Sequence, residues 1–372
     1  MRRLLNTAIA VLSILAALRA QGGFAELKTR LDAERDALVR AKDGRLAFDD
    51  VQKLATSAAA QLERFLAASK GDDAANARLM LANVWLDVGK TDAAKSALLG
   101  FDPAATAPLA LVAAAELAAR LGDDALRERL TVAAVDAEAP LEQRMALAIF
   151  LATRLVDLPR AEGIFAAATA AAKDDEARAH VAWYRVNCTR AREDVEEDAW
   201  VEELKALEKA YPKTYWGGVA RDRLRALESK PGDAAIAFAG TSLDGQRIAL
   251  SELAGKVVLV EFWGERAERA GPFLAKLHAD YAERGLVIVG VAALEDRARA
   301  TALASSTGRV WPQLFDGRGL ATDLALRLGV ERLPELLLID RQGKLAVTSA
   351  WIDDADGRTE LRDAIERALG KS

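Results

Sequence analysis

Two patterns of apolar residues divide the chain. From about residue 24 to residue 230, alanine and leucine recur at helical spacing between charged residues, and runs of β-branched residues are almost absent. Glycine and proline fall between these periodic stretches, as in "DVGKTD", "RLGDD" and "KAYPKTYWGG". The pattern predicts helices that are paired by short turns, and we expect one helical domain over residues 24–230.

The second pattern begins after Pro231 and Gly232, where valine, isoleucine, leucine and phenylalanine gather in short runs. The runs are "IAFAGTS", "RIALSEL", "KVVLVEFW", "LVIVGVAAL", "PELLLID" and "KLAVTSAW". Helical stretches between and after them cover residues 273–284, 295–306, 319–328 and 358–369. Continuous apolar runs are typical of strands that are buried on both faces of a sheet. We therefore expect a helix-covered mixed sheet over residues 234–372, with a linker and boundary over residues 231–239.

Part of the helical region resembles tetratricopeptide repeats. In "ARLMLANVWLDVGKTDAAKSALLGFDP", Leu81, Ala82, Trp85 and Gly89 stand where that repeat places its packing and turn residues, and a weaker copy turns at Gly122. The resemblance implies stacked helical hairpins with a concave surface that is open to a partner, and it implies burial of Leu81 and Trp85 between helices. An irregular helical bundle without a groove fits the same pattern.

The first twenty residues have the features of a secretory signal. Arg2 and Arg3 precede fifteen uncharged, mostly apolar residues, which are fewer than the roughly 20 that a membrane span needs. We expect residues 1–20 to be a signal peptide that is cleaved after Ala20, leaving no stable membrane span. The protein would then be exported to the periplasm or cell envelope of a bacterium.

The composition of the chain bears on its partners, its disulfides and its metal sites. The 51 Lys and Arg residues are balanced by 56 Asp and Glu residues without a long block of one sign, which argues against nucleic acid as a partner. Cys188 is the single cysteine, so no intramolecular disulfide forms, and we interpret it as a buried helical residue rather than a reactive thiol. His180 and His278 lack the spacing of metal ligands, and we expect no metal or other cofactor.

Residues 234–372 resemble a thioredoxin-fold redoxin of the TlpA/ResA type, related to the AhpC/TSA group. The resemblance rests on "SLDGQRIALSELAGKVVLVEFW", "ERGLVIVGVAALED" and "WPQLFDGRGLATDLALRLGVERLPELLLIDRQGKL", which stand in family order and spacing. It implies a thioredoxin-like mixed sheet. It also implies the activity of an exported thiol-disulfide oxidoreductase.

The residues that carry this activity in the family are missing. In the family, Phe-Trp is followed by Ala-Thr-Trp-Cys-Pro-Pro-Cys, and a gapless comparison puts Ala267 and Ala270 at the two cysteine positions with Glu268 and Arg269 between them. Thiol-disulfide exchange needs a thiolate and a second sulfur that resolves the mixed disulfide. No serine or threonine lies between residues 262 and 276 to replace them.

Glu265 and Glu268 are the acidic residues of this segment. They could form an acid/base pair, but carboxylates at the start of a helix more often offset its dipole. We favour the structural interpretation.

The resemblance also suggests a binding site. Leu333-Pro334 aligns with the cis-proline that faces the motif in thioredoxin folds, where the preceding backbone can pair with a peptide. We take Trp263, Arg266, Arg269, Leu333 and Pro334 as candidate binding residues for a protein or peptide partner. Inherited fold geometry explains the proline equally well.

Pro272 bears on where the helix after the motif begins. If the helix began at Ala267, as the family's motif implies, the proline ring would meet the carbonyl four residues back and kink the helix. Proline is favourable in a first turn, and Gly271 accepts many backbone dihedrals. We predict that "GERAERA" is partly or wholly an irregular loop and that the helix begins near Gly271 or Pro272.

Together these features predict an exported two-domain protein with a thioredoxin-like domain that has lost its redox chemistry and serves in binding or scaffolding. The alternative is a thiol-disulfide oxidoreductase, the activity that the family resemblance implies. Fold alone does not decide between them.

Overall fold

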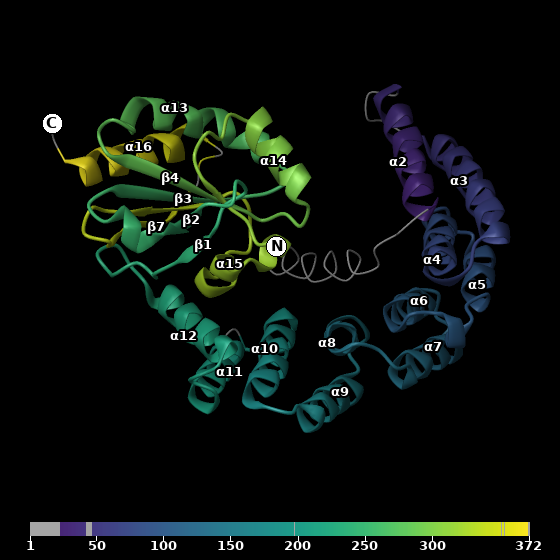
Figure 1. Cartoon of the computed structure of the whole chain (residues 1–372). Coiled ribbons are helices and arrows are strands. Elements are labelled where there is room, and N and C mark those ends of the chain that lie inside the picture. The colour runs from purple at the N-terminus through teal and green to yellow at the C-terminus, as the bar shows by residue number, and fades with distance from the viewer. Residues whose placement is uncertain (1–22, 42–46, 197, 351, 353, 371–372) are drawn as a thin grey trace. The chain divides into compact units, whose positions relative to one another are not determined.

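The computed structural model describes residues 23–41, 47–196, 198–350, 352 and 354–370. The expected signal peptide at residues 1–20, with its cleavage point after Ala20, lies outside these residues. The chain divides into two compact units, and the boundary between them falls between Glu203 and Leu204. The first is helical and the second contains a mixed sheet with helices on its faces, which confirms the predicted fold class (Figure 1).

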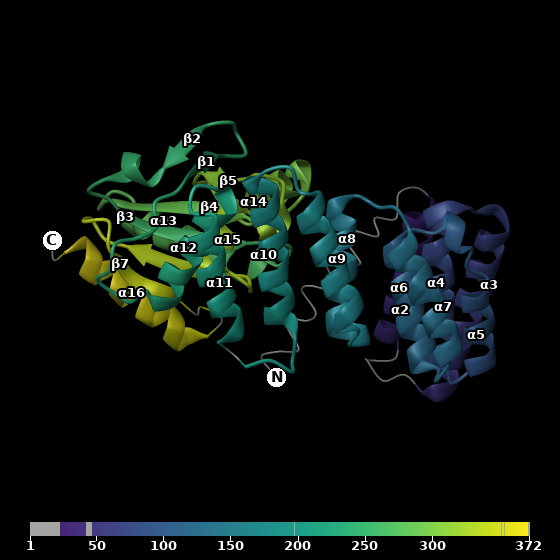
Figure 2. The ribbon, with the colours of Figure 1, turned by 90° about the horizontal axis from the view of Figure 1, so that it is seen from below.

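The N-terminal unit is built from successive antiparallel helices. They are α2 (Gly23–Ala41), α3 (Phe48–Ala68), α4 (Gly71–Asp87), α5 (Thr91–Leu99), α6 (Pro108–Arg120), α7 (Asp124–Asp136), α8 (Leu141–Phe150), α9 (Leu158–Ala171), α10 (Asp175–Ala191) and the start of α11 (Ala199–Ala210). Helices α4, α6 and α8 pack against α5, α7 and α9 respectively, and α4, α6, α8 and α10 contact one another in that order. Figure 2 shows the helices of this unit side by side with roughly parallel axes.

Three of the helix pairs turn through a residue with a positive φ. Gly89, Gly122 and Val156 each adopt a positive φ, of 73°, 69° and 55°. The amide of the next residue then donates back into the preceding helix, from Lys90 to Trp85 O (2.8 Å), from Asp123 to Ala118 O (2.9 Å) and from Asp157 to Leu151 O (2.8 Å). A third helix pair therefore has a turn with a positive φ, in addition to the two glycine turns that the sequence indicates.

The third turn differs from the other two in length and in residue type. A π-helical turn over Leu151–Leu155 adds one residue to the loop that the Asp157 amide closes, and Val156 stands where the earlier turns have glycine. A β-branched side chain is strongly disfavoured in the left-handed region. The side chain of Val156 is 69% exposed, so packing contributes little to offset this strain.

The packing residues of the first helix pair are only partly as expected. Leu81 is buried within the helical core, as predicted. Trp85 is only half-buried, and Lys90 Nζ lies 4.5 Å from the centre of its ring. The prediction of burial therefore holds only in part for Trp85, because its ring packs against the margin of the core and the ammonium of Lys90 lies over it.

The C-terminal unit contains a five-stranded sheet with the order β5-β4-β3-β6-β7. Its strands are β3 (Val257–Trp263), β4 (Leu286–Ala292), β5 (Gln313–Leu314), β6 (Glu335–Ile339) and β7 (Leu345–Ala350). Strand β3 is parallel to β4 and antiparallel to β6, and β6 and β7 form an antiparallel hairpin. Strands β1 (Ala239–Thr241) and β2 (Arg247–Ala249) form a separate antiparallel pair.

Helices cover both faces of this sheet, which is why its central strands have continuous apolar sequences. They are α13 (Gly271–Tyr281), α14 (Arg297–Ser306), α15 (Asp323–Leu328) and α16 (Ala355–Leu369). Helices α13 and α16 pack on the face that carries Leu259 and Ile288, and α15 packs on the face that carries Val260 and Phe262 (Figure 1). All seven residues of β3 are buried.

One further helix, α12 (Tyr215–Glu228), packs with the C-terminal unit. It contacts α15, and its side chains Trp216 and Val219 are buried. The helical domain expected over residues 24–230 would have included this helix. The change from helices to strands does fall near Pro231, as the sequence indicates, but the compact unit begins earlier because α12 has its packing partner there.

Replacing Val156 by glycine should stabilise the N-terminal unit. Relief of the left-handed strain is worth about 1–2 kcal/mol, and the added backbone freedom of glycine in the unfolded chain removes part of it, so we expect a gain of about 1 kcal/mol. The measurement is denaturant unfolding of the Val156→Gly protein. Gly122→Val, the matched reverse change, should lower the free energy of unfolding, whereas a loss of stability in Val156→Gly would contradict the strain.

Candidate functional site

The candidate site lies where β3 ends at Trp263 and the chain turns into α13. Residues Ala267–Arg269 form a single 3₁₀ turn, and the α-helix begins at Gly271 with Pro272 in its first turn. The predicted start of the helix is confirmed, and the loop is irregular except for this one turn. Proline stands where its missing N–H has no intrahelical acceptor to lose.

Glycine is required at the first residue of α13. A Cβ atom at Gly271 would lie 2.5 Å from the carbonyl oxygen of Thr307 and 2.9 Å from Nη1 of Arg309. The loop after α14 therefore packs directly against the backbone at the start of α13. This close approach brings the side chain of Arg309 beneath the turn.

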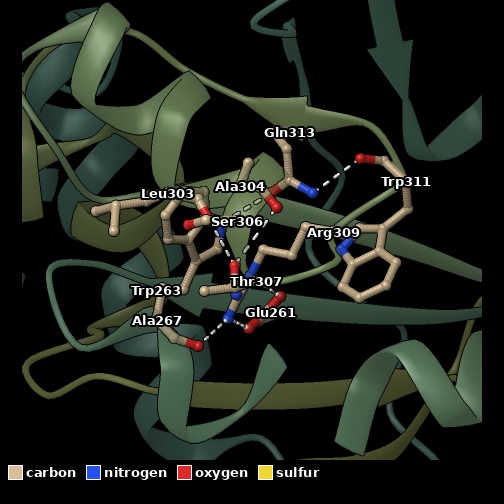
Figure 3. A network of polar contacts seen from close by, with 10 residues as sticks. All are labelled: Glu261, Trp263, Ala267, Leu303, Ala304, Ser306, Thr307, Arg309, Trp311 and Gln313. Atoms are coloured by element: carbon tan, nitrogen blue, oxygen red, sulfur yellow. Dashed lines mark hydrogen bonds and ion pairs between the residues drawn. The ribbon is translucent and has the colours of Figure 1, made fainter. Parts of the chain in front are cut away.

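Arg309 forms a buried ion pair with Glu261 in the middle of β3 (Figure 3). Its Nη2 donates to Oε1 of Glu261 at 2.6 Å and its Nε donates to Oε2 at 3.2 Å, while neither side chain exposes any surface. Two parallel hydrogen bonds of this kind are the strongest arrangement between a guanidinium and a carboxylate. The pair joins the central strand to the loop after α14.

The same guanidinium also holds the turn. Nη2 of Arg309 donates to the carbonyl oxygen of Ala267 at 3.0 Å, and Nη1 donates to the hydroxyl of Thr307. Its Cζ lies 4.8 Å from the centre of the Trp263 ring, within the range of a cation–π contact. Arg309 thereby connects β3, the 3₁₀ turn and its own loop through one side chain (Figure 3).

Trp263 belongs to this buried network. Its indole N–H donates to Oε1 of Gln313 at 2.7 Å, and Nε2 of Gln313 donates to the carbonyl oxygen of Trp311 at 2.8 Å. A Cβ atom at Gly290 would lie 1.8 Å from Oε1 of Gln313, so the glycine makes room for this amide. Trp263, a candidate binding residue, is only 1% exposed, and its ring and its N–H make contacts inside the domain.

Burial dominates the electrostatics of Glu261. It raises the pKa of the carboxyl group, while the charge and hydrogen bonds of Arg309 and the indole N–H of Trp311 oppose the rise. The Trp311 N–H is close enough to act on this pKa but makes no hydrogen bond of normal geometry. The carboxylate is thus enclosed by donors and has no exposed surface on which to act as a base.

Of the other candidate binding residues, Arg266 lies on the turn, and Leu333 and Pro334 lie in the loop that packs beside it. The Leu333–Pro334 peptide bond is cis, as expected, and both residues are half-buried. The position that a Cβ atom would take at Gly264 is 2.8 Å from Cδ1 of Leu333, so the proline loop packs on the turn. Arg266 is exposed, and the side chain of Arg269 lies outside the part of the structure that is described.

The two glutamates of the turn face solvent. Glu265 forms an exposed ion pair with Arg299 of α14 at 2.8 Å, and Glu268 is also exposed. The two carboxylates do not lie together in a buried site. This placement favours the structural interpretation over an acid/base pair.

The sequence did not single out Arg309, Thr307, Gln313 or Glu261. The one available signal was the charge of Glu261 within the buried run "VVLVEFW", since a charge at such a position requires a partner. The identity of that partner, 48 residues away, could not be read from the pattern.

Comparisons with known proteins agree with this geometry. The model of the AhpC/TSA family matches residues 231–348. The thiol-disulfide oxidoreductase ResA of Halalkalibacterium halodurans is 30% identical over 145 residues, which are 38% of this chain and 79% of that protein. The chain belongs to the AhpC/TSA family. Its family similarity lies in the C-terminal unit.

Three further proteins are similar to part of this chain. ResA of Bacillus thuringiensis is 31% identical over 111 residues, which are 29% of this chain and 62% of that protein. A thiol:disulfide interchange protein of the thioredoxin family from Chlorobium tepidum superposes with a TM-score of 0.32 at 22% identity, over 38% of this chain and 99% of that one. A thiol-disulfide oxidoreductase from Bacteroides fragilis has the same TM-score at 19% identity, over 35% of this chain and 99% of that one.

Outside the AhpC/TSA domain, Cys188 is the remaining candidate for thiol chemistry. It lies in α10, it is 5% exposed, and burial raises the pKa of its thiol to about 12. The rings of His180 and His278 pack near Tyr184 and Trp311. Among the described residues, no group of three or more potential ligands could hold a metal ion, and no helix is long and apolar enough to cross a membrane.

Breaking the ion pair of the AhpC/TSA domain should be more harmful than removing both charges. Arg309→Met leaves the buried Glu261 carboxyl without its partner, and we expect a loss of about 3–5 kcal/mol in the free energy of unfolding. Adding Glu261→Leu to this variant should recover most of that loss, because two apolar side chains need no partner. Denaturant unfolding of the single and double variants measures both. A loss below about 1 kcal/mol in the single variant, or no recovery in the double variant, would contradict the account.

Proposed function

We propose that this protein is a redox-inactive member of the AhpC/TSA family that binds a protein or peptide partner in the bacterial cell envelope. The observation that carries the proposal is the pair Ala267 and Ala270 at the positions where the family resemblance places two cysteines. Both side chains are buried, at 2% and 1% exposure, and the C-terminal unit contains no cysteine. A methyl group neither attacks a disulfide nor resolves a mixed disulfide.

The single cysteine of the chain supports the same proposal. Exchange proceeds through the thiolate, and a thiol whose pKa is about 12 is almost wholly protonated near neutral pH. Cys188 is also buried among the helices of the N-terminal unit, and a lone thiol has no resolving partner. It therefore offers no substitute for the missing pair.

The remaining surface of the turn is suited to binding. Arg266, Leu333 and Pro334 are exposed or half-buried around a turn whose underside is fixed by Arg309. A surface that is already ordered loses little conformational entropy when a partner binds. This supports a peptide-binding role for the proline loop.

Export and a repeat-like N-terminal unit are two further parts of the proposal. The signal pattern of residues 1–20 supports export, and the recurring turns at Gly89, Gly122 and Val156 support a tetratricopeptide-like arrangement of the N-terminal helices. Such helix pairs stack through their neighbours and expose an extended surface. The N-terminal unit would then provide a second place for a partner or scaffold contact.

The rival function is thiol-disulfide exchange, and the identity of 30% to a ResA oxidoreductase is the observation that favours it. The two functions differ in a simple assay. The purified protein should not accelerate the reduction of insulin by dithiothreitol, and Cys188→Ala should give the same rate as the unchanged protein. The ResA of H. halodurans serves as the positive control. Turnover that is above the uncatalysed rate and absent from Cys188→Ala would restore the oxidoreductase.

Binding at the proline loop needs its own test. A photoreactive benzoylphenylalanine in place of Leu333 should give a discrete adduct in the native envelope of the source bacterium. The matched control carries the same group at Gln342, an exposed residue of the turn at the opposite end of β6. The same adducts from both positions, or none from position 333, would contradict the proposed binding site.

A further inference from the structure

A side chain of α12 reaches the loop that carries the cis-proline. Arg223 is almost fully buried, with 7% of its side chain exposed, and its Nη2 donates to Oε1 of Glu331 at 2.7 Å. Glu331 stands three residues before Pro334 in the same loop. A buried guanidinium is costly to desolvate unless it is paired, so its position depends strongly on this carboxylate.

The backbone of the loop is shaped around the same guanidinium. Gly329 ends α15 in the left-handed conformation, with a φ of 77°, and a Cβ atom there would lie 2.1 Å from Nη1 and 2.4 Å from Cζ of Arg223. The dihedral favours glycine at this position, and a Cβ atom there would displace the guanidinium. Arg223 therefore packs against the first residue of the loop and binds the side chain of the third.

Other polar contacts fix α12 on α15. Asp222 accepts a hydrogen bond from Nε of Arg327 at 2.7 Å, and Nη2 of Arg327 also donates to the carbonyl oxygen of Ala237 at 2.9 Å. The hydroxyl of Tyr215 donates to Oδ1 of Asp323 at 2.8 Å. These contacts along α12 keep Arg223 at a constant place relative to the loop.

The far end of the loop contacts the turn of the candidate site. Leu333 packs on Gly264, and the turn that follows is held from below by the bond between Arg309 and the Ala267 carbonyl. A continuous set of contacts thus runs from Arg223 through loop 329–334 to the turn. Helix α12 lies outside residues 231–348, the part of the chain that the family model matches.

We propose that α12 is a working part of the binding site, and that Arg223 is a positioning residue that sets the conformation of loop 329–334 and thereby the place of Leu333 and Pro334. The use of that loop for binding rests on the proposed function. The control of the loop by α12 does not. A shift of α12 would move the binding loop directly, which gives the segment before the AhpC/TSA domain a means of regulating it.

Amide hydrogen exchange on the full-length protein, read residue by residue by NMR, tests this control. The informative amides are those of Gly329 and Val330, which both donate to the carbonyl oxygen of Ala325, and that of Ala270, which donates to Ala267 O. In Arg223→Ala all three should exchange at least about tenfold faster, as a local loss of 1.4 kcal/mol would give. The amide of Ser242, which donates to the carbonyl oxygen of Gln246 across the turn between β1 and β2, should keep its rate.

Two further variants make the result specific. Arg221→Ala, which removes an exposed guanidinium from the same helix, is the matched control and should leave the three rates unchanged. Glu331→Gln removes the charge from the loop side, and it should speed exchange at the same amides by a smaller factor. If Arg223→Ala fails to fold, the exchange rates of Glu331→Gln test the inference in its place.

Three outcomes would overturn the inference: unchanged loop amides, faster exchange that is confined to α12, or equal acceleration throughout the C-terminal unit, including Ser242. The test needs no partner. If exchange responds as expected but the photoreactive group at position 333 captures nothing, the proposed function fails and the control of the loop by α12 stands.

Discussion

The ion pair between Glu261 and Arg309 is the constraint on which the candidate site depends. A carboxylate in the centre of a fully buried strand demands a buried cation, and the cation comes from a loop that must then pack against the start of α13. Glycine at position 271 permits that approach, and the guanidinium has a donor left for the carbonyl of Ala267. The shape of the turn therefore follows from the need to pair the buried carboxylate of Glu261.

The sequence predicted those parts of the fold that depend on local patterns. The apolar run of β3 indicated a strand buried on both faces, and Pro272 with Gly271 indicated where α13 begins. Long-range side-chain contacts left no such pattern, so the partner of Glu261 could not be identified. The third helical turn was also missed, since Val156 replaces the glycine that marks the other two.

Family membership establishes the fold of the C-terminal unit but leaves its chemistry to individual residues. The unit keeps the sheet, the cis-proline loop and a firmly held turn, while the positions expected for sulfur carry methyl groups. Its turn is held by hydrogen bonds from Arg309, and its proline loop by a side chain from a helix outside the family match. These features together support a scaffold that presents an ordered surface to a partner.

The central claim is that Arg309, which is buried and forms two hydrogen bonds to Glu261, holds the turn between β3 and α13. The exchange of its guanidinium Nε–H with solvent, followed by NMR at pH 8, tests the claim most directly. We predict a resolved Nε–H resonance that exchanges slowly, beside the rapid exchange of the exposed Arg225. Equally rapid exchange at Arg309 and Arg225 would contradict the claim, because a buried, paired guanidinium is shielded from solvent.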